Sequence, residues 1–355
     1  MEKFNANDKE AVEIRKKIKY LNSIGYNTKI LDVISIEDVR KFESDNNIKL
    51  PDDYVWFITN VGNGGTWQNS NYHFWSLEEA YFSDEALPDW ETGQENFSLD
   101  ILSKGCSYSF GIILKGEHFG EISSNGDRMA FYNNGIKVHG FKELYTKWLN
   151  ETCMGYDEYG FERRLSGTIE DNLQQYKNLH NIESLWSIFS KINTKVAYDE
   201  FISEVYQIFV SETKNKNKVL FTKILIKSGY KNVHNLLEKI FIPENYSQII
   251  FELYVSMNYF EKYLYAEGVM ENAEIYYPML VEMLKHYEAL DKSIDDINLK
   301  YCFEMTVMNP DYNENDIIDI LTSDDKRIVN CLARFYQENM IKRIGKYIQE
   351  AKNKQ

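Results

Sequence analysis

The hydrophobic period of this chain changes part-way along it, and this change constrains the fold more than any other feature. Up to about residue 150 the pattern mixes short amphipathic helices with runs typical of β-strands, whereas from about residue 168 helical spacing dominates. A chain with this order of elements is expected to form an α+β domain followed by an all-helical domain. The length of 355 residues also favours two domains over one.

The first part, residues 1–150, is expected to form a mixed, mostly antiparallel sheet flanked by helices. Apolar residues at helical spacing predict helices over about 11–21, 36–42 and 52–61, and the segment Gly62-Asn63-Gly64-Gly65 ends the third of them. Strands separated by glycine and asparagine turns are predicted at 72–75, 108–114, 120–123, 128–132 and 136–139. A helix over 141–149 closes this unit.

The second part, residues 168–355, is expected to be an all-helical domain of stacked helix pairs, joined to the first by a linker at 151–167. Helices are predicted at 168–180, 195–210, 219–227, 233–241, 246–265, 273–290, 297–308, 316–321 and 325–351. The sequence shows no convincing period of solenoid length, so a degenerate helical-repeat array stays open as an alternative.

Charge and hydropathy narrow the classes of partner. The formal net charge is −15, which disfavours nucleic acid and favours a partner with a basic surface. No apolar run approaches the roughly 18 residues of a membrane span. The start, Met1 to Asn5, is not followed by the apolar run of a secretory signal. We therefore expect a cytoplasmic protein with no membrane partner.

Residue patterns for catalysis or for cofactors are weak. The four cysteines are scattered singly and are interpreted as reduced, buried thiols, and the histidines show no metal-ligand spacing. The segment Gly62-Asn63-Gly64-Gly65 is not followed by the lysine and serine or threonine of a phosphate loop, so a turn is the better interpretation. We expect no catalytic residues, no metal and no cofactor; an unrecognised hydrolase or nucleotide-binding enzyme is the alternative.

One stretch combines acids with aromatic residues. Residues 50–103 contain ten Asp or Glu residues and no Lys or Arg. Rigid aromatic anchors surrounded by complementary charge are typical of tight protein interfaces. The predicted contact residues are Trp67, Trp75, Glu78, Glu79, Tyr81, Asp84, Glu85, Asp89, Trp90 and Glu91.

Two simpler interpretations stay open for this stretch. The aromatic residues could fill the core of the sheet while the acids are only solvated. Asp52 and Asp53 fall in the first turn of a helix, where carboxylates interact favourably with the helix dipole, so a structural role is the better interpretation for this pair.

The segment from residue 36 to residue 65 resembles the signature of the Smi1/Knr4 (SUKH) family. That signature is a short helix ending in an acidic residue, an isoleucine-x-leucine-proline approach to a proline-x-x-tyrosine helix, and an asparagine-glycine-glycine exit. The matching residues are Glu43, Ile48, Leu50, Pro51, Tyr54, Phe57, Ile58, Asn63, Gly64 and Gly65. Downstream, Phe110-Gly111-Ile112, Gly120-Glu121-Ile122 and Phe141 to Leu144 resemble the central strands and the closing helix of the family.

The resemblance covers roughly residues 30–150 and implies an α/β domain with a curved mixed sheet. Many bacterial members of the family are immunity proteins that bind polymorphic toxins, often nucleases, whereas fungal members are regulatory scaffolds. It therefore implies a non-catalytic immunity protein that neutralises a cognate toxin, possibly a nuclease. Given the net charge of −15, we expect that toxin to have a basic surface and to be inhibited by occlusion of its active site. The alternative that it implies is a non-catalytic regulatory scaffold.

Overall fold

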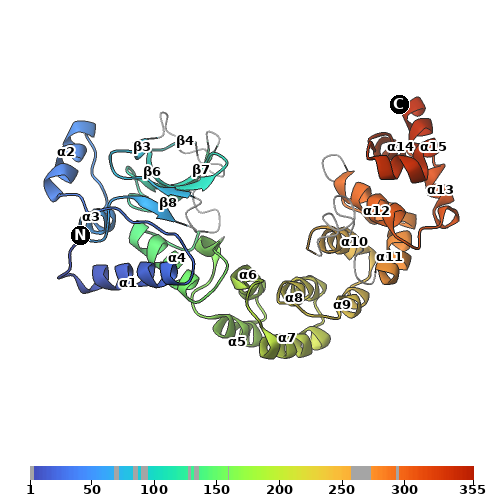
Figure 1. The fold of residues 1–355 in the computed structure, drawn as a ribbon, viewed down its shortest axis with the longest axis horizontal. Coiled ribbons are helices and arrows are strands. Elements are labelled where there is room, and N and C mark those ends of the chain that lie inside the picture. The colour runs from blue at the N-terminus through green and yellow to red at the C-terminus, as the bar shows by residue number, and fades with distance from the viewer. Residues whose placement is uncertain are drawn as a thin grey trace. The chain divides into compact units, whose positions relative to one another are not determined.

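The computed structural model describes residues 4–67, 72–82, 87–88, 95–126, 129–131, 136–158, 160–256, 273–292 and 296–355. The chain divides into two compact units, residues 1–196 and residues 197–355 (Figure 1). The first unit holds the sheet and its helices, and the second is helical throughout its described residues. The predicted order, an α+β part followed by an all-helical part, is confirmed.

Four helices of the first unit flank the sheet: α1 (Lys9–Ser23), α2 (Ile36–Asn46), α3 (Asp52–Asn60) and α4 (Phe141–Cys153). Ser35 caps α2 by accepting a hydrogen bond from the backbone N–H of Asp38, as a serine at this position favours. Asp53 lies in the first turn of α3, and its Oδ2 atom accepts from the backbone nitrogen of Lys142 at 3.1 Å. This carboxylate therefore also caps the start of α4 and joins the two helices.

The main sheet has seven strands, and within the described residues its strands pair antiparallel. Its strands are β1 (Gly65–Trp67), β2 (Tyr72–Phe74), β3 (Tyr81–Phe82), β6 (Ser98–Gly105), β7 (Tyr108–Ile113), β8 (Ile122–Gly126) and β9 (Met129–Phe131). The order is β1-β2-β6-β7-β8-β9, and β3 also pairs with β6. A separate pair, β4 (Leu87–Pro88) with β5 (Glu95–Asn96), makes a second small sheet near β9.

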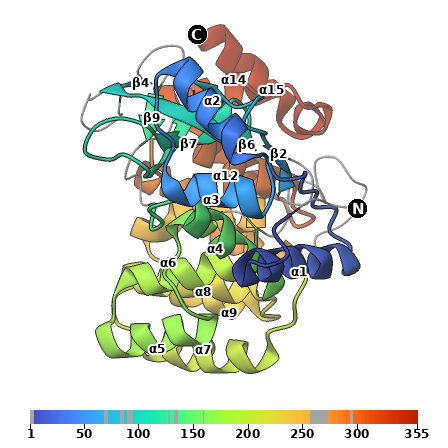
Figure 2. The same ribbon diagram turned by 90° about the vertical axis from the view of Figure 1, so that its left-hand side faces the viewer.

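One face of the sheet packs on helices and forms the core of the first unit (Figure 2). Phe57 of α3 contacts Phe74 and Phe141 with ring centroids 5.9 and 4.9 Å apart. Trp67 is fully buried and packs against Trp148 of α4 at 5.8 Å. Burial of several large aromatic side chains supplies most of the driving force for holding helices and sheet together.

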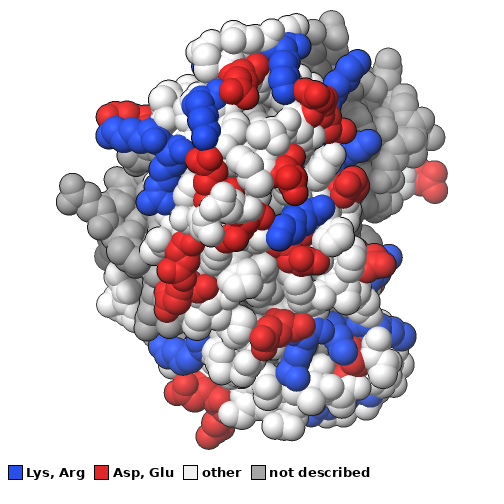
Figure 3. Space-filling view, turned by 90° about the vertical axis from the view of Figure 1, so that its right-hand side faces the viewer, with Lys and Arg blue, Asp and Glu red and all other residues white. Residues whose placement is uncertain are grey.

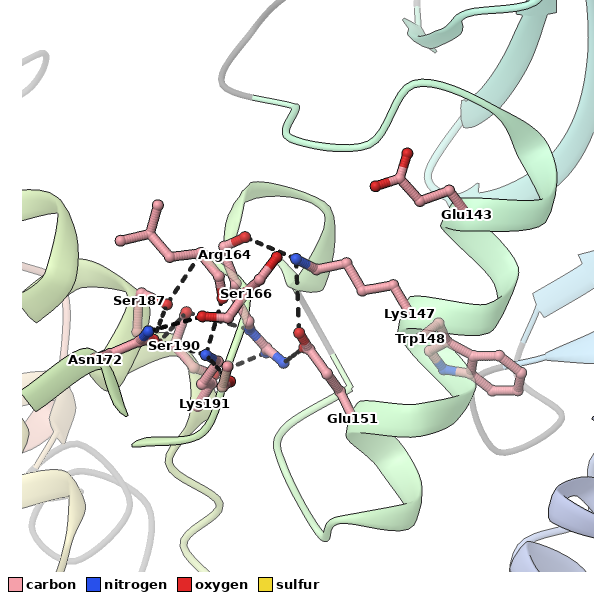
Figure 4. Close-up of polar contacts among 12 residues, drawn as sticks. Glu143, Lys147, Trp148, Glu151, Arg164, Ser166, Asn172, Ser187, Ser190 and Lys191 are labelled. Atoms are coloured by element: carbon pink, nitrogen blue, oxygen red, sulfur yellow. Dashed lines mark hydrogen bonds and ion pairs between the residues drawn. The ribbon is translucent and has the colours of Figure 1, made fainter. Parts of the chain in front are cut away.

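Helices α5 (Ile169–Leu179) and α6 (Ile182–Lys191) also belong to the first unit, and a buried polar network connects them to α4 (Figure 4). The guanidinium of Arg164, which is 1 % exposed, donates to Glu151 at 2.8 Å and to the Ser190 carbonyl at 2.8 Å. The ammonium of Lys191 donates to the Gly167 carbonyl and to Asn172. Residues 151–167, predicted as a linker, thus lie within the first unit and carry part of this network.

The second unit contains α7 (Asp199–Ser211), α8 (Asn215–Lys227), α9 (Val233–Lys239), α10 (Tyr246–Phe251), α11 (Ala273–Lys285), α12 (Ile297–Met308), α13 (Ile318–Leu321), α14 (Lys326–Ala333) and α15 (Glu338–Lys354). Arg327 of α14 contacts both carboxylate oxygens of Asp296, just before α12, at 2.5 and 2.6 Å. The single helix predicted over 325–351 is instead two helices. The chain turns after Ala333, where Phe335 enters the core and Tyr336 stays exposed.

Candidate partner-binding edge

The connection from β2 to β3 places two aromatic rings and two carboxylates at the surface of the first unit. We call residues 75–81 the Trp75–Tyr81 edge. The rings of Trp75 and Tyr81 meet edge to face with centroids 5.0 Å apart, and Tyr81 is 48 % exposed. Glu78 and Glu79 lie in the turn between them and are exposed. Four of the ten predicted contact residues are therefore brought together here.

Asn63 and Gly64, which follow α3, contact the turn of this edge and hold it in place. Asn63 accepts a hydrogen bond from the backbone nitrogen of Leu77 at 2.9 Å and donates to Glu78 at 3.1 Å. Gly64 has a φ of +97°, and a Cβ atom there would lie 2.6 Å from the backbone nitrogen of Ser76. Only glycine allows this close approach together with this backbone angle. The asparagine and glycine that end α3 therefore also hold the turn of the edge in place.

A second support is a row of facing residues across four strands. Tyr81 of β3 pairs with Asp100 of β6, Asp100 pairs with Gly111 of β7, and Gly111 pairs with Ser123 of β8. Directly paired side chains point to the same face of a sheet. Phe82, the neighbour of Tyr81, pairs with Leu99, which belongs to the core, so the row lies on the face away from the helices.

The face that carries this row is lined by small polar side chains around Asp100. Asp100 is 5 % exposed and accepts hydrogen bonds from Ser109 at 2.7 Å and from Asn125 at 2.5 Å. Asn125 also donates to the hydroxyl of Ser98 at 2.9 Å. A Cβ atom on Gly111 would lie 2.5 Å from the Asn125 amide nitrogen and 2.9 Å from an Asp100 oxygen, so the cluster fills the space that glycine leaves.

Burial sets the electrostatics of the pair at the end of the row. Burial raises the pKa of Asp100, and hydrogen bonds from Ser109, Asn125 and Tyr81 oppose that rise. Burial also raises the pKa of the Tyr81 hydroxyl, and the neighbouring Asp100 charge and the hydrogen bond between them raise it further. The Tyr81 ring is thus fixed at one end by a buried carboxylate and along its side by Trp75, with much of its surface in solvent.

Residues 34–135, which include the edge, its support and the polar row, match the SMI1/KNR4 family (SUKH-1). This part of the chain is a SUKH domain. No curated protein and no solved structure matches the chain. The family is typical of immunity proteins to polymorphic toxins and is generally non-catalytic.

The other predicted contact residues lie elsewhere. Trp67 is fully buried in the core of the SUKH domain and donates its indole N–H to the Ser103 carbonyl at 2.8 Å, so it offers no surface to a partner. Asp84, Glu85, Asp89, Trp90 and Glu91 lie outside the described residues.

Two supporting residues were not among the predicted contact residues. The sequence pattern assigns Asn63 only to the exit of a helix. Its position before two glycines in the family signature is the signal that could have indicated its supporting hydrogen bonds. Asp100 was counted with the acids of the stretch. Its position inside a strand, which was not predicted, decides that it is buried.

A shallow pocket of about 300 Å³ lies at another end of the SUKH domain, lined among others by Asp52, Asp53, Phe119 and His139. His118 lies 3.4 Å from Glu121 in the same turn. Among the described residues, no group of three or more His, Cys, Asp or Glu side chains is arranged to hold a metal ion. Within the same residues, no helix is both long and apolar enough to cross a bilayer.

Proposed function

We propose that this chain is an immunity protein that binds a cognate polymorphic toxin with a basic surface and neutralises it by occluding its active site. The observation that carries the proposal is the Trp75–Tyr81 edge within a SUKH domain. It combines an aromatic pair, in which Tyr81 is exposed and Trp75 is half-buried, with two exposed carboxylates on a rigid support.

The aromatic pair has the properties of an interface anchor. Hot-spot residues are enriched in Trp and Tyr, and anchors that are ordered before binding lose less conformational entropy when the complex forms. Trp75 is tied to the sheet by a hydrogen bond from its backbone nitrogen to the Ile101 carbonyl at 3.0 Å. Tyr81 is held by Asp100. The edge therefore presents its rings in one arrangement.

Charge supports a basic partner. Glu78 and Glu79 belong to the stretch 50–103, which has ten acids and no base. Such a surface accelerates encounter with a cationic protein and discriminates against acidic ones. Asp84, Glu85, Asp89, Trp90 and Glu91 are proposed to extend the same contact. By contrast, the face of the molecule in Figure 3 carries basic and acidic side chains interspersed among its described residues.

Occlusion needs no chemistry from the inhibitor. A standard interface of roughly 1,600 Å² covers the cleft of a small toxin domain and supports affinities in the nanomolar range or tighter. The carboxylates of the edge are proposed to occupy the position that substrate phosphates would take if the toxin is a nuclease.

The test is an affinity purification from the native host with the full chain as bait, followed by mass spectrometry. A single toxin domain with a basic surface, recovered at one-to-one stoichiometry and inhibited by the purified chain, is the expected result. Recovery of host signalling or envelope enzymes with no toxin would replace this proposal by the regulatory scaffold.

A pair of variants then locates the contact. E78Q/E79Q keeps side chains that can still accept the hydrogen bonds from Asn63 and Ser76 but removes two charges. We expect slower association and a weaker dependence of affinity on salt. The matched control is E170Q/E183Q, which removes two acids from α5 and α6 of the same unit. Equal effects of the two pairs would show that net charge, rather than the edge, attracts the partner.

A further inference from the structure

The amino-terminal region contains a pocket whose charge is opposite to that of the chain as a whole. Residues 14–31 contain five Lys or Arg residues and no Asp or Glu, in a chain of net charge −15. A pocket of about 320 Å³ lies between α1 and the following segment 27–31. No carboxylate is among its lining residues, which are Arg15, Ile18, Lys19, Asn22, Asn27, Thr28, Lys29, Ile30 and Leu31.

The floor of this pocket is rigid and cationic. Arg15 is 3 % exposed and donates to the carbonyls of Val61 at 2.8 Å and Leu31 at 2.9 Å. Asn22 closes the turn that follows α1 by exchanging two hydrogen bonds of 2.9 Å with the backbone of Thr28. The positions of the pocket wall are therefore fixed by buried contacts rather than by surface side chains.

Two exposed lysines at the rim of the pocket form no ion pair with any carboxylate among the described residues. Lys19 and Lys29 line the pocket and are exposed. Among the described residues, neither ammonium has a carboxylate within ion-pair distance, whereas the neighbouring Lys16 pairs with Glu13 at 2.7 Å. Two lysines beside one pocket would repel each other less if an anion lay between them.

One residue of the pocket wall also carries a buried hydroxyl. Thr28 is 2 % exposed and lines the pocket, and within the described residues its Oγ1 atom has no hydrogen-bond partner. Buried polar groups in native proteins are nearly always paired with protein or with a bound molecule. This hydroxyl lies beneath the pocket surface, so the two lysines, and not Thr28, are the groups that face a ligand.

We propose that this pocket binds the phosphate group of a small molecule, independently of any toxin that the Trp75–Tyr81 edge binds. Lysine is a common point-charge ligand of phosphate, and a dianion balances two ammonium groups where a single carboxylate would not. The volume is at the lower end of the range for small-molecule sites, so it fits a phosphate monoester of nucleotide size or smaller.

The experiment is a titration of the purified full chain with inorganic phosphate and, separately, with adenosine 5′-monophosphate at low ionic strength, followed by calorimetry or amide NMR shifts. Saturable binding with a Kd below about 1 mM is expected for at least one of them. Tighter binding of the nucleotide would identify an organic phosphate monoester as the ligand class, and equal affinities would identify the inorganic anion.

Three variants keep the proposal falsifiable. K19A and K29A are each expected to weaken phosphate binding by about fivefold or more, and K16A, on the same helix but outside the pocket, to leave it unchanged. These are surface lysines, so folding is not at risk. The site would be overturned if neither probe binds saturably. It would also be overturned if K16A weakens phosphate binding as much as K19A and K29A do. Neither result bears on toxin binding.

Discussion

Tyr81 and Asp100 are direct partners across β3 and β6, so an exposed aromatic ring of the edge is hydrogen-bonded to a buried carboxylate. The pairing links the surface proposed for partner binding to the polar cluster behind it. Asp100 receives further hydrogen bonds from Ser109 and Asn125, which hold the carboxylate in place. The orientation of the ring is therefore set by the interior of the sheet.

The contribution of this ring can be separated into its surface and its hydroxyl. Y81A removes both and is expected to weaken binding of the captured toxin by about 2 kcal/mol, roughly 30-fold, as for an aromatic hot spot. Y81F keeps the ring and loses only the hydrogen bond to Asp100, so a loss of about 1 kcal/mol is expected. Surface plasmon resonance with both variants measures the difference. If Y81A binds like the wild type, the edge is not the contact surface.

The buried ion pair between Glu151 and Arg164 predicts a large stability effect far from the edge. E151A leaves an arginine that is 1 % exposed without its carboxylate, and removing one partner of a buried pair costs about 3 kcal/mol. Urea unfolding followed by circular dichroism should show this loss in the free energy of unfolding.

The matched control for that variant is E183A on α6. The Glu183 side chain is 64 % exposed and lies 4.0 Å from Lys137, so a change of about 0.5 kcal/mol or less is expected. If the two variants lose the same stability, the network in Figure 4 does not hold α4 to the helices that follow it.

Glu158 predicts a dependence of stability on pH. Burial, with a smaller contribution from the nearby Asp157 charge, raises its pKa from 4.5 to about 7, while Lys195 and a hydrogen bond from Tyr26 oppose the rise. Between those two values the folded chain keeps a proton that the unfolded chain has released, so the free energy of unfolding falls as pH rises from 4.5 to 7.

Replacing this carboxylate tests the sign of that effect. E158Q should stabilise the protein at pH 8 by about 1 kcal/mol, a value reduced because the side chain is only partly buried, and should change little at pH 4. Thermal melts of wild type and variant at the two pH values measure it. A variant that is less stable than wild type at pH 8 would contradict the stated direction.

The sequence predicted the parts of the fold in which apolar spacing and turn residues agree. The helices around the SUKH signature and strands β2, β7, β8 and β9 were found in this way, and the strand predicted at 136–139 was not. The central strand β6 was missed because Ser98, Asp100 and Ser103 interrupt its apolar pattern. Ser98 and Asp100 are polar yet face a buried polar cluster, and sequence patterns assign polar residues to solvent.

Helix α6 was missed for a related reason. Its three serines at 184, 187 and 190 are typical of loops, since serine competes for backbone hydrogen bonds. In the fold, Ser187 donates to Asn172 and Ser190 accepts from Arg164, so the serines serve the buried network instead. The candidate site was predicted only in part for the same physical reason: a pattern cannot tell that Trp67 points into the core and Tyr81 out of it.

Gly111 provides the sharpest test of the polar row behind the edge. G111A adds a methyl group where the Asn125 amide, an Asp100 oxygen and the Ser98 hydroxyl converge within 3.0 Å. Its φ is not in the left-handed region, so the effect is steric crowding alone. The added carbon must displace the cluster, with an expected loss of about 1–3 kcal/mol in the free energy of unfolding.

Displacement of Asp100 would also release Tyr81, so the same variant should weaken partner binding. S123A is the matched control, because Ser123 lies in the same row and its truncation removes an oxygen without adding volume. It should cost about 1 kcal/mol or less and leave binding unchanged. Denaturant unfolding and affinity measured on the same two proteins would show whether the row supports the edge. If G111A is destabilised yet binds the partner normally, the row contributes to folding and does not support the edge for binding.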